Sequence, residues 1–155
     1  MRISLSKSHY NIKIYPDKKR LYLDIDEVLL TTKLTRPSEN VIEIIDYILE
    51  HFDCYWITTH CNADSNREIN YLSQYFDDKV LQKLQHFKPS NWFTLKSEAF
   101  DFTTDFIWLE DYPFLTEIAF LKTYKVGCSE SSNHFSTFLF KEFLSNLEDR
   151  WSCVF

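Results

Sequence analysis

The stretch over residues 20–30 constrains this chain most, because an apolar run ends there in two aspartates, Asp24 and Asp26, with only Ile25 between them. An apolar run of this length is typical of a strand buried on both faces, and open α/β sheets place their sites just beyond the carboxyl ends of such strands. We therefore predict a strand over 21–25, with both aspartates on one side of it. Two neighbouring carboxylates repel each other unless a cation such as Mg²⁺, which prefers oxygen ligands, offsets their charge. The alternative interpretation is an acidic strand end that faces water.

The composition is that of one globular domain. The chain has 155 residues, of which 45% are hydrophobic and 14 are Phe, so it can bury a core of its own. We expect a single domain, with an N-terminal arm or hairpin over 1–19, an α/β core over 20–147 and a C-terminal tail over 148–155. A single Gly excludes a glycine-rich loop that cradles phosphate. The net charge of −6 disfavours a protein that binds nucleic acid by bulk electrostatics.

Other chemistry has little support in the residue pattern. The histidines are scattered and the four cysteines lack zinc-like spacing, so we expect reduced structural thiols rather than a zinc site. The chain shows neither a secretory apolar region nor an apolar run of membrane-spanning length. We expect a cytoplasmic protein with no membrane partner.

Strands and helices alternate along the predicted core. In order we predict a helix beginning at 37–39 and reaching 52, a strand over 54–57, a helix over 63–76, a short helix over 80–87, a strand over 106–109, a weaker strand near 120–126 and a helix over 131–147. This alternation predicts an α/β fold in three layers, a three-layer α/β/α sandwich with a mainly parallel, Rossmann-like sheet.

Polar residues follow each of the three clearest strands. They are Asp24 and Asp26 after the first strand, Thr58 and Thr59 after the second, and Glu110 and Asp111 after the third. Because the carboxyl ends of parallel strands meet at one edge of a sheet, we expect these side chains to lie close together. Taken singly, each pair is also typical of an ordinary turn or a solvated loop.

The order of these residues resembles the haloacid dehalogenase superfamily. Its first motif is D-x-D-G-[TV] after an apolar strand, and here residues 24–28 read D-I-D-E-V, with Glu27 in place of the usual glycine. An apolar strand ending in Thr, then a Lys, then an apolar strand ending in acids follow in the superfamily's order. The segments W-I-T at 56–58 and W-L-E-D at 108–111 resemble a small bacterial subgroup without a cap domain, which includes the domain found in multidomain RNA-repair proteins.

The resemblance implies a role for each polar residue at the strand ends. Asp24 would be the nucleophile that becomes an aspartyl phosphate, and Asp26 the general acid and base. Thr58 and Thr59 would bind the phosphoryl group, and Lys96 would offset its charge, with Lys88 as an alternative lysine. The implied ligands of the Mg²⁺ cofactor are Asp24, Asp26 and one of the pair Glu110 and Asp111.

The implied function is a Mg²⁺-dependent phosphohydrolase that acts on a phosphomonoester. Neither the interval from 26 to 37 nor that from 58 to 96 has room for a cap domain, so we expect an open site that suits a large phosphorylated substrate. One alternative is a catalytically silent binding or accessory module that retains the fold. Another is a phosphatase for nucleic-acid ends, which the subgroup suggests and the acidic net charge disfavours.

Overall fold

A computed structural model describes residues 18–31, 33–59, 64–110 and 113–124. The predicted helix over 131–147, the C-terminal tail and nearly all of the N-terminal arm lie outside the described residues. So does Asp111, one of the two predicted acidic ligands after the third strand.

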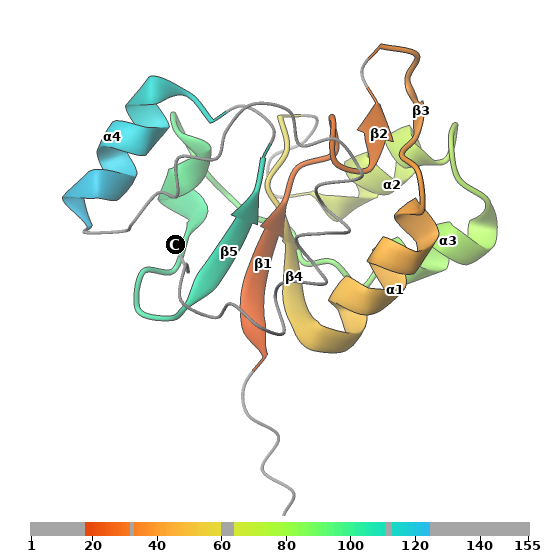
Figure 1. The fold of residues 1–155 in the computed structure, drawn as a ribbon, viewed down its shortest axis with the longest axis horizontal. Helices are drawn as coiled ribbons and strands as arrows, with labels where there is room; N and C mark the ends of the chain where they lie inside the picture. Colours follow the sequence, from red (N-terminus) through yellow and green to blue (C-terminus); the bar gives the residue numbers. More distant parts are fainter. Residues whose placement is uncertain (1–17, 32, 60–63, 111–112, 125–155) are drawn as a thin grey trace, which may run out of the picture.

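The central element is a parallel sheet, as the sequence predicted, and it has three strands in the described residues. Its strands are β1 (Lys19–Leu23), β4 (Phe52–Trp56) and β5 (Phe106–Leu109), in the order β4-β1-β5, so β1 lies in the middle (Figure 1). In the register of the sheet Leu23 pairs with both Trp56 and Leu109. All three strands therefore end at the same level, and the residues that follow them start from a common edge.

β5 has the predicted bounds, whereas β1 and β4 (Phe52–Trp56, predicted over 54–57) differ from the prediction by one or two residues at their ends. β1 ends at Leu23 rather than at Ile25, yet its neighbours still hold the backbone beyond it, because the amide of Asp24 donates to the carbonyl of Leu109 (3.1 Å). The amide of Ile57 likewise donates to the carbonyl of Leu23 (3.0 Å). The predicted site residues therefore begin where the backbone is still tied to the sheet.

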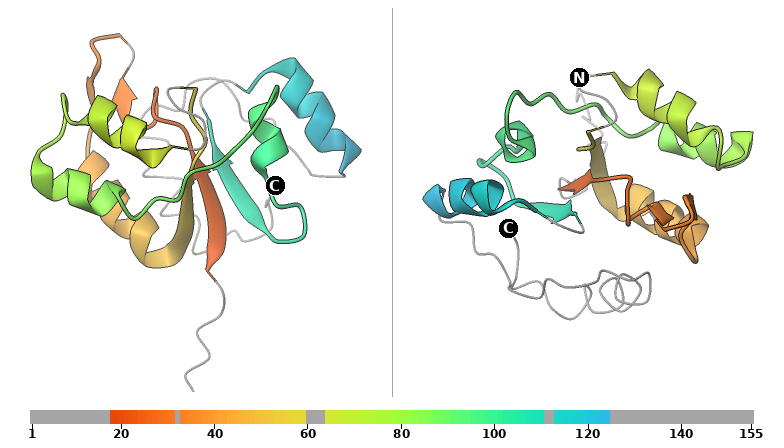
Figure 2. Two further views of the ribbon diagram at one scale, coloured as in Figure 1. Left: turned by 180° about the vertical axis from the view of Figure 1, so that it is seen from behind. Right: turned by 90° about the horizontal axis from the view of Figure 1, so that it is seen from above.

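Alternation along the strands divides the core between the two faces of the sheet. Leu21 and Leu23 of β1 belong to the larger buried cluster, whereas Tyr22 belongs to a smaller one with Phe100 and Leu121. The larger cluster also takes buried side chains from α1 (Val41–His51), α2 (Ser65–Leu72) and α3 (Asp78–Leu84). Figure 2 shows these three helices grouped beside β4, while the 3₁₀ helix η1 (Lys96–Ala99) and α4 (Leu115–Thr123) lie beside β5.

Capping residues explain where two of the helices begin. The side chain of Asp64 accepts a hydrogen bond from the amide of Asn66 (3.0 Å), and that of Asp77 accepts one from Val80 (2.9 Å), so α2 and α3 start directly after them. Both helices are shorter than the predicted ranges 63–76 and 80–87, because turns follow Leu72 and Leu84. None of the helices in the described part of the chain combines the length and the hydropathy needed to span a membrane.

The helix predicted to begin at 37–39 begins later, at Val41. Arg36 and Pro37 instead form β3 (Arg36–Pro37), which pairs antiparallel with β2 (Leu30–Thr31). Asn40 then has φ 56°, a left-handed conformation that a continuing helix does not use. The segment between the central strand and α1 is therefore a small hairpin.

The strand predicted near 120–126 is wrong. Residues up to Thr123 belong to α4, which begins at Leu115 and buries Leu121. A short apolar run does not distinguish a strand from a helix by its pattern alone. The side chain of Glu117 accepts a hydrogen bond from the amide of Phe114 (3.1 Å), which caps the helix at a position that the apolar run does not reveal.

Candidate functional site

Three charged side chains from distant parts of the chain meet at the carboxyl edge of the sheet. The ammonium Nζ of Lys96 lies 2.7 Å from Oδ2 of Asp24 and 2.6 Å from Oε2 of Glu110. The side chains of the three residues are only 7–8% exposed. Asp24 and Glu110 follow adjacent strands, β1 and β5, and Lys96 opens η1, so the tertiary structure brings together three of the residues that the sequence singled out. We call these three residues the buried ionic cluster.

The carboxylate of Asp24 is held through both of its oxygens. Oδ2 accepts from Lys96, and Oδ1 accepts from the amide of the next residue, Ile25 (2.8 Å). Hydrogen bonds from a cation and from a backbone amide restrict the rotation of this side chain. A carboxylate with a fixed orientation suits both nucleophilic attack and metal binding.

Burial perturbs the other two members of the cluster in different ways. It raises the pKa of Glu110 to about 9, and the charge of Asp24 acts in the same direction, while Lys96 opposes the shift. Burial by itself lowers the pKa of Lys96, but the two acidic neighbours outweigh it and raise that pKa above its ordinary value. The pKa values of Glu110 and Lys96 are therefore both above those of the free side chains, Glu110 chiefly through burial and Lys96 through its two acidic neighbours.

Asp26 lies in a turn rather than in the buried ionic cluster. Its neighbour Glu27 has φ 55°, in the left-handed region that glycine adopts without steric cost. The amides of Leu29 and Leu30 both donate to the carbonyl of Ile25 (2.9 and 3.0 Å), which closes the turn. The turn therefore forms with Glu27 in place of glycine, at a conformational cost of about 1 kcal/mol.

Tyr71 of α2 lies near Asp26, and the sequence did not single it out. Burial raises the pKa of Tyr71, a hydrogen bond with Tyr75 adds to this, and the charge of Asp26 also contributes. The two rings pack edge to face, with centroids 5.5 Å apart. In the sequence Tyr75 belongs to the apolar stripe of the predicted helix and Tyr71 does not, and neither position carries a signal of proximity to an acid.

The two threonines after β4 have different environments. Thr58 is 1% exposed, whereas Thr59 is exposed. Because Trp56 pairs with Leu23, the register places Thr58 next to the segment that follows β1 and carries Asp24. Thr58 therefore has the burial of a residue inside a site, and Thr59 that of a residue at its edge.

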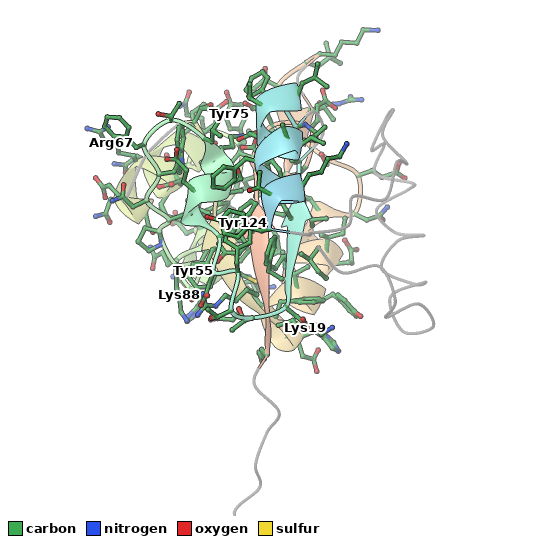
Figure 3. The ribbon with its side chains drawn as sticks, turned by 90° about the vertical axis from the view of Figure 1, so that its left-hand side faces the viewer. Lys19, Tyr55, Arg67, Tyr75, Lys88 and Tyr124 are labelled. Carbon is green, nitrogen blue, oxygen red and sulfur yellow. The ribbon has the colours of Figure 1, made fainter. Side chains whose placement is uncertain are left out.

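Lys88, the alternative to Lys96, points to other partners. Its ammonium forms an ion pair with Asp53 of β4 (2.6 Å) and lies over the ring of Tyr55, 5.2 Å from its centroid. Figure 3 shows Tyr55 and Lys88 side by side. Of the two lysines, only Lys96 contacts Asp24.

The donor set at the edge fits Mg²⁺ by its chemistry. Among the described residues no three His, Cys, Asp or Glu side chains are grouped closely enough to enclose a metal ion. Two carboxylates, Asp24 and Glu110, nevertheless face a single cationic group, the Lys96 ammonium. Mg²⁺ in proteins is typically held by one or two carboxylates, with water and substrate phosphate as the remaining ligands. The two acids match that number of protein ligands.

Comparisons with protein-family models, with curated proteins and with solved structures gave no match.

Proposed function

We propose that this chain is a Mg²⁺-dependent phosphohydrolase of the haloacid dehalogenase type, in which Asp24 attacks a phosphomonoester. The observation that carries the proposal is the contact of Lys96 with both Asp24 and Glu110 at the shared edge of three parallel strands. The order β4-β1-β5 puts the aspartate-bearing strand between the strands that lead to Thr58 and Glu110. This arrangement fits the roles that the family resemblance assigns to these residues.

The reaction has two displacements at phosphorus. A carboxylate oxygen of Asp24 forms a bond to phosphorus while the bond to the alcohol oxygen breaks, and Asp26 gives its proton to that oxygen. Water then attacks the aspartyl phosphate, Asp26 takes up a proton from it, and the bond between phosphorus and Asp24 breaks to release phosphate. The Lys96 ammonium and the Thr58 hydroxyl stabilise the negative charge on the phosphoryl oxygens in both steps. Asp24 and Glu110 would hold Mg²⁺, whose charge offsets that of the same oxygens.

The proposed fold is the three-layer form of the family, without a cap domain. Between Thr59 and Lys96 the described residues make α2 and α3, and both helices bury side chains, Leu72 and Leu84 among them, in the larger core cluster. Helices that pack into the core do not form a lid over the site. A large phosphorylated substrate whose own surface covers the site is therefore the substrate class that we propose.

A catalytically silent binding module is the second candidate. Lys96 already neutralises the acids that a metal would otherwise bind, and this contact is the observation that favours it. In such a module the buried ionic cluster would be structural. The two candidates differ in whether the chain turns over a phosphate ester.

The test is turnover of p-nitrophenyl phosphate with Mg²⁺ by the wild type and by Asp24→Asn. We expect Asp24→Asn to lose more than about 99% of the activity, because the amide is not a nucleophile. Asp53→Asn is the control, since Asp53 is also an aspartate in an ion pair with a lysine, Lys88, but lies within β4 and away from the buried ionic cluster. Retention of more than a few per cent of turnover by Asp24→Asn would contradict the covalent mechanism.

Substrate class is tested in the same assay. A phosphorylated oligonucleotide, a phosphorylated protein and a panel of nucleotides and sugar phosphates are compared at equal concentration. Selective submillimolar saturation by one small metabolite would contradict an open site. No turnover of any of them by a folded wild type would favour the silent module.

A further inference from the structure

Glu117 is a buried carboxylate that the proposed reaction does not use. It belongs to the first turn of α4 and is only 2% exposed. A buried carboxylate is costly unless hydrogen bonds satisfy it, so its contacts indicate why it is there.

The two oxygens of Glu117 join two segments of the chain. Oε1 accepts from the backbone amide of Lys96 (2.9 Å), and Oε2 accepts from the backbone amide of Phe114 (3.1 Å). Lys96 opens η1, and Phe114 precedes α4, so both amides lie at helix starts where no intrahelical carbonyl is available to them. One carboxylate thus satisfies two unpaired donors and ties η1 to the start of α4.

The linked segments are those that supply the buried ionic cluster. Lys96 provides the ammonium, and α4 follows Glu110 along the chain and lies with η1 beside β5 (Figure 1). Hydrogen bonds to a charged acceptor are stronger than neutral ones, so Glu117 restrains the backbone from which the lysine extends. Moving that backbone would move the ammonium away from Asp24.

We propose that Glu117 is a positioning residue, which holds Lys96 at the distance where its ammonium meets Asp24 and Glu110. This inference rests on the proposed phosphohydrolase function for its effect on rate, but the linkage itself does not. Displacement of a catalytic group by about 1 Å costs on the order of a hundredfold in rate.

The 3₁₀ helix η1, which begins with Lys96, also contains the control residue, Glu98. Its Oε2 accepts from the amides of Phe93 (2.9 Å) and Thr94 (3.0 Å), so Glu98 also binds two backbone donors. Both bonds stay within the segment that leads into η1, and neither reaches α4. Glu98→Gln therefore removes a charged acceptor from the same loop, keeps one oxygen that can accept both bonds, and leaves the link to α4 intact.

The experiment compares Glu117→Gln with Glu98→Gln in kcat and KM for p-nitrophenyl phosphate. Gln accepts with one atom only, so Glu117→Gln loses one of the two bonds. We expect its kcat to fall about 10- to 100-fold with KM changed by less than about threefold, while Glu98→Gln stays within about twofold of the wild type. Equal losses in the two variants would overturn the inference.

A double-mutant cycle with Lys96→Met tests that Glu117 acts through the lysine. In that background we expect Glu117→Gln to cause no further loss of kcat, because the group that it positions is gone. A full additional loss would overturn the inference.

Hydrogen exchange of the backbone amides in the wild type tests the linkage without a variant and without an activity assay. It therefore applies even if Glu117→Gln does not fold or the chain shows no turnover. We expect the amides of Lys96 and Phe114 to exchange slowly and together, whatever the activity. Rapid exchange of either one would overturn the linkage. Absence of turnover with slow exchange would contradict the proposed function and leave the linkage supported.

Discussion

The two ends of the three-stranded sheet both hold oppositely charged side chains, but only one end buries them. At the carboxyl end the side chains of the buried ionic cluster are 7–8% exposed. Toward the start of the strands, the ion pairs of Lys88 with Asp53 and of Arg20 with Asp101 have side chains that are 30–54% exposed. Figure 3 shows Lys19, Tyr55 and Lys88 at that end of the molecule, away from Tyr75. We call the two ion pairs, Lys88 with Asp53 and Arg20 with Asp101, the exposed ionic cluster.

The difference in burial separates two kinds of charge. Exposed ion pairs contribute about 0–1 kcal/mol each and form readily wherever long charged side chains meet. Taking ionisable groups out of water costs several kcal/mol for each one that stays charged, and packed apolar residues would often be at least as stable. An arrangement that is poor for stability is better explained by chemistry, and this is why the buried end rather than the exposed end carries the proposed function.

The exposed cluster also contains an aromatic ring that stabilises its cations. The guanidinium of Arg20 and the ammonium of Lys88 lie 5.6 and 5.2 Å from the centroid of the Tyr55 ring. Cations over an aromatic face are attracted to it while they remain in contact with water. These contacts account for the cluster without a ligand.

The largest expected effect is a difference in folding stability between two single variants, one that removes the lysine of the buried ionic cluster and one that removes a lysine of the exposed ionic cluster. Lys96→Met leaves the carboxyls of Asp24 and Glu110 buried without their cation, so we expect a loss of about 3–5 kcal/mol in the free energy of unfolding. Lys88→Met should cost about 1 kcal/mol or less, and its effect should shrink in high salt. Urea unfolding of both variants measures the difference. Equal losses would mean that the two clusters do not differ as their burial indicates.

The next effect is the dependence of stability on pH, which should have opposite signs at the two ends. The pKa of Glu110 is raised from 4.5 to about 9, chiefly by burial, so its contribution is fully present below about pH 4.5 and is lost as pH rises through 9. Hydrogen bonds from Thr103 lower the pKa of Asp101 from 3.8, so its contribution is present above that pH and is lost as pH falls through its folded pKa.

Urea midpoints measured across this pH range in EDTA, for wild type, Glu110→Gln and Asp101→Asn, test both signs. In Glu110→Gln the urea midpoint should fall less toward alkaline pH than in the wild type. In Asp101→Asn the urea midpoint should fall less toward acid pH than in the wild type. An alkaline decline that is unchanged in Glu110→Gln would show that burial does not raise its pKa.

A smaller effect concerns Asp26, which lies at the buried end but outside the buried ionic cluster. If it is the general acid, Asp26→Asn should slow an alkyl phosphate at least about tenfold more than p-nitrophenyl phosphate, because a good leaving group needs little protonation. Steady-state kcat values along a series of leaving groups measure this ratio. Equal losses along the series would assign Asp26 to metal binding or to the turn.

The smallest effect is on backbone strain, which also lies at the carboxyl end. Glu27 has φ 55° directly after Asp26, so Glu27→Gly should stabilise the fold by about 1 kcal/mol or less. Asn40→Gly is the control, since Asn40 has φ 56° but Asn tolerates this conformation better than Glu. Destabilisation by Glu27→Gly, measured in urea, would show that the Glu27 side chain contributes more than its backbone costs.

Sequence alone predicted the parallel sheet and the residues at its edge, because these depend on local patterns. The run before Asp24 and the strand β5 (Phe106–Leu109) are short apolar stretches bounded by charged residues. Such a stretch is typical of a buried strand whatever the rest of the chain does. Local pattern failed near 120–126, where the helix α4 replaced a predicted strand, because the packing of Leu121 and the hydrogen bond from the Lys96 amide to Glu117 depend on distant residues.

The tertiary structure decided which candidates meet. It brought Lys96 to Asp24 across 72 residues, and it directed Lys88 to Asp53, although both lysines carry the same charge. It also placed Glu110 in contact with Lys96, a contact that the order of residues in the sequence does not predict. The physical reason is that residue type and order determine which chemistry is available. Register, burial and backbone links such as that of Glu117 determine which side chains come within hydrogen-bond distance of one another.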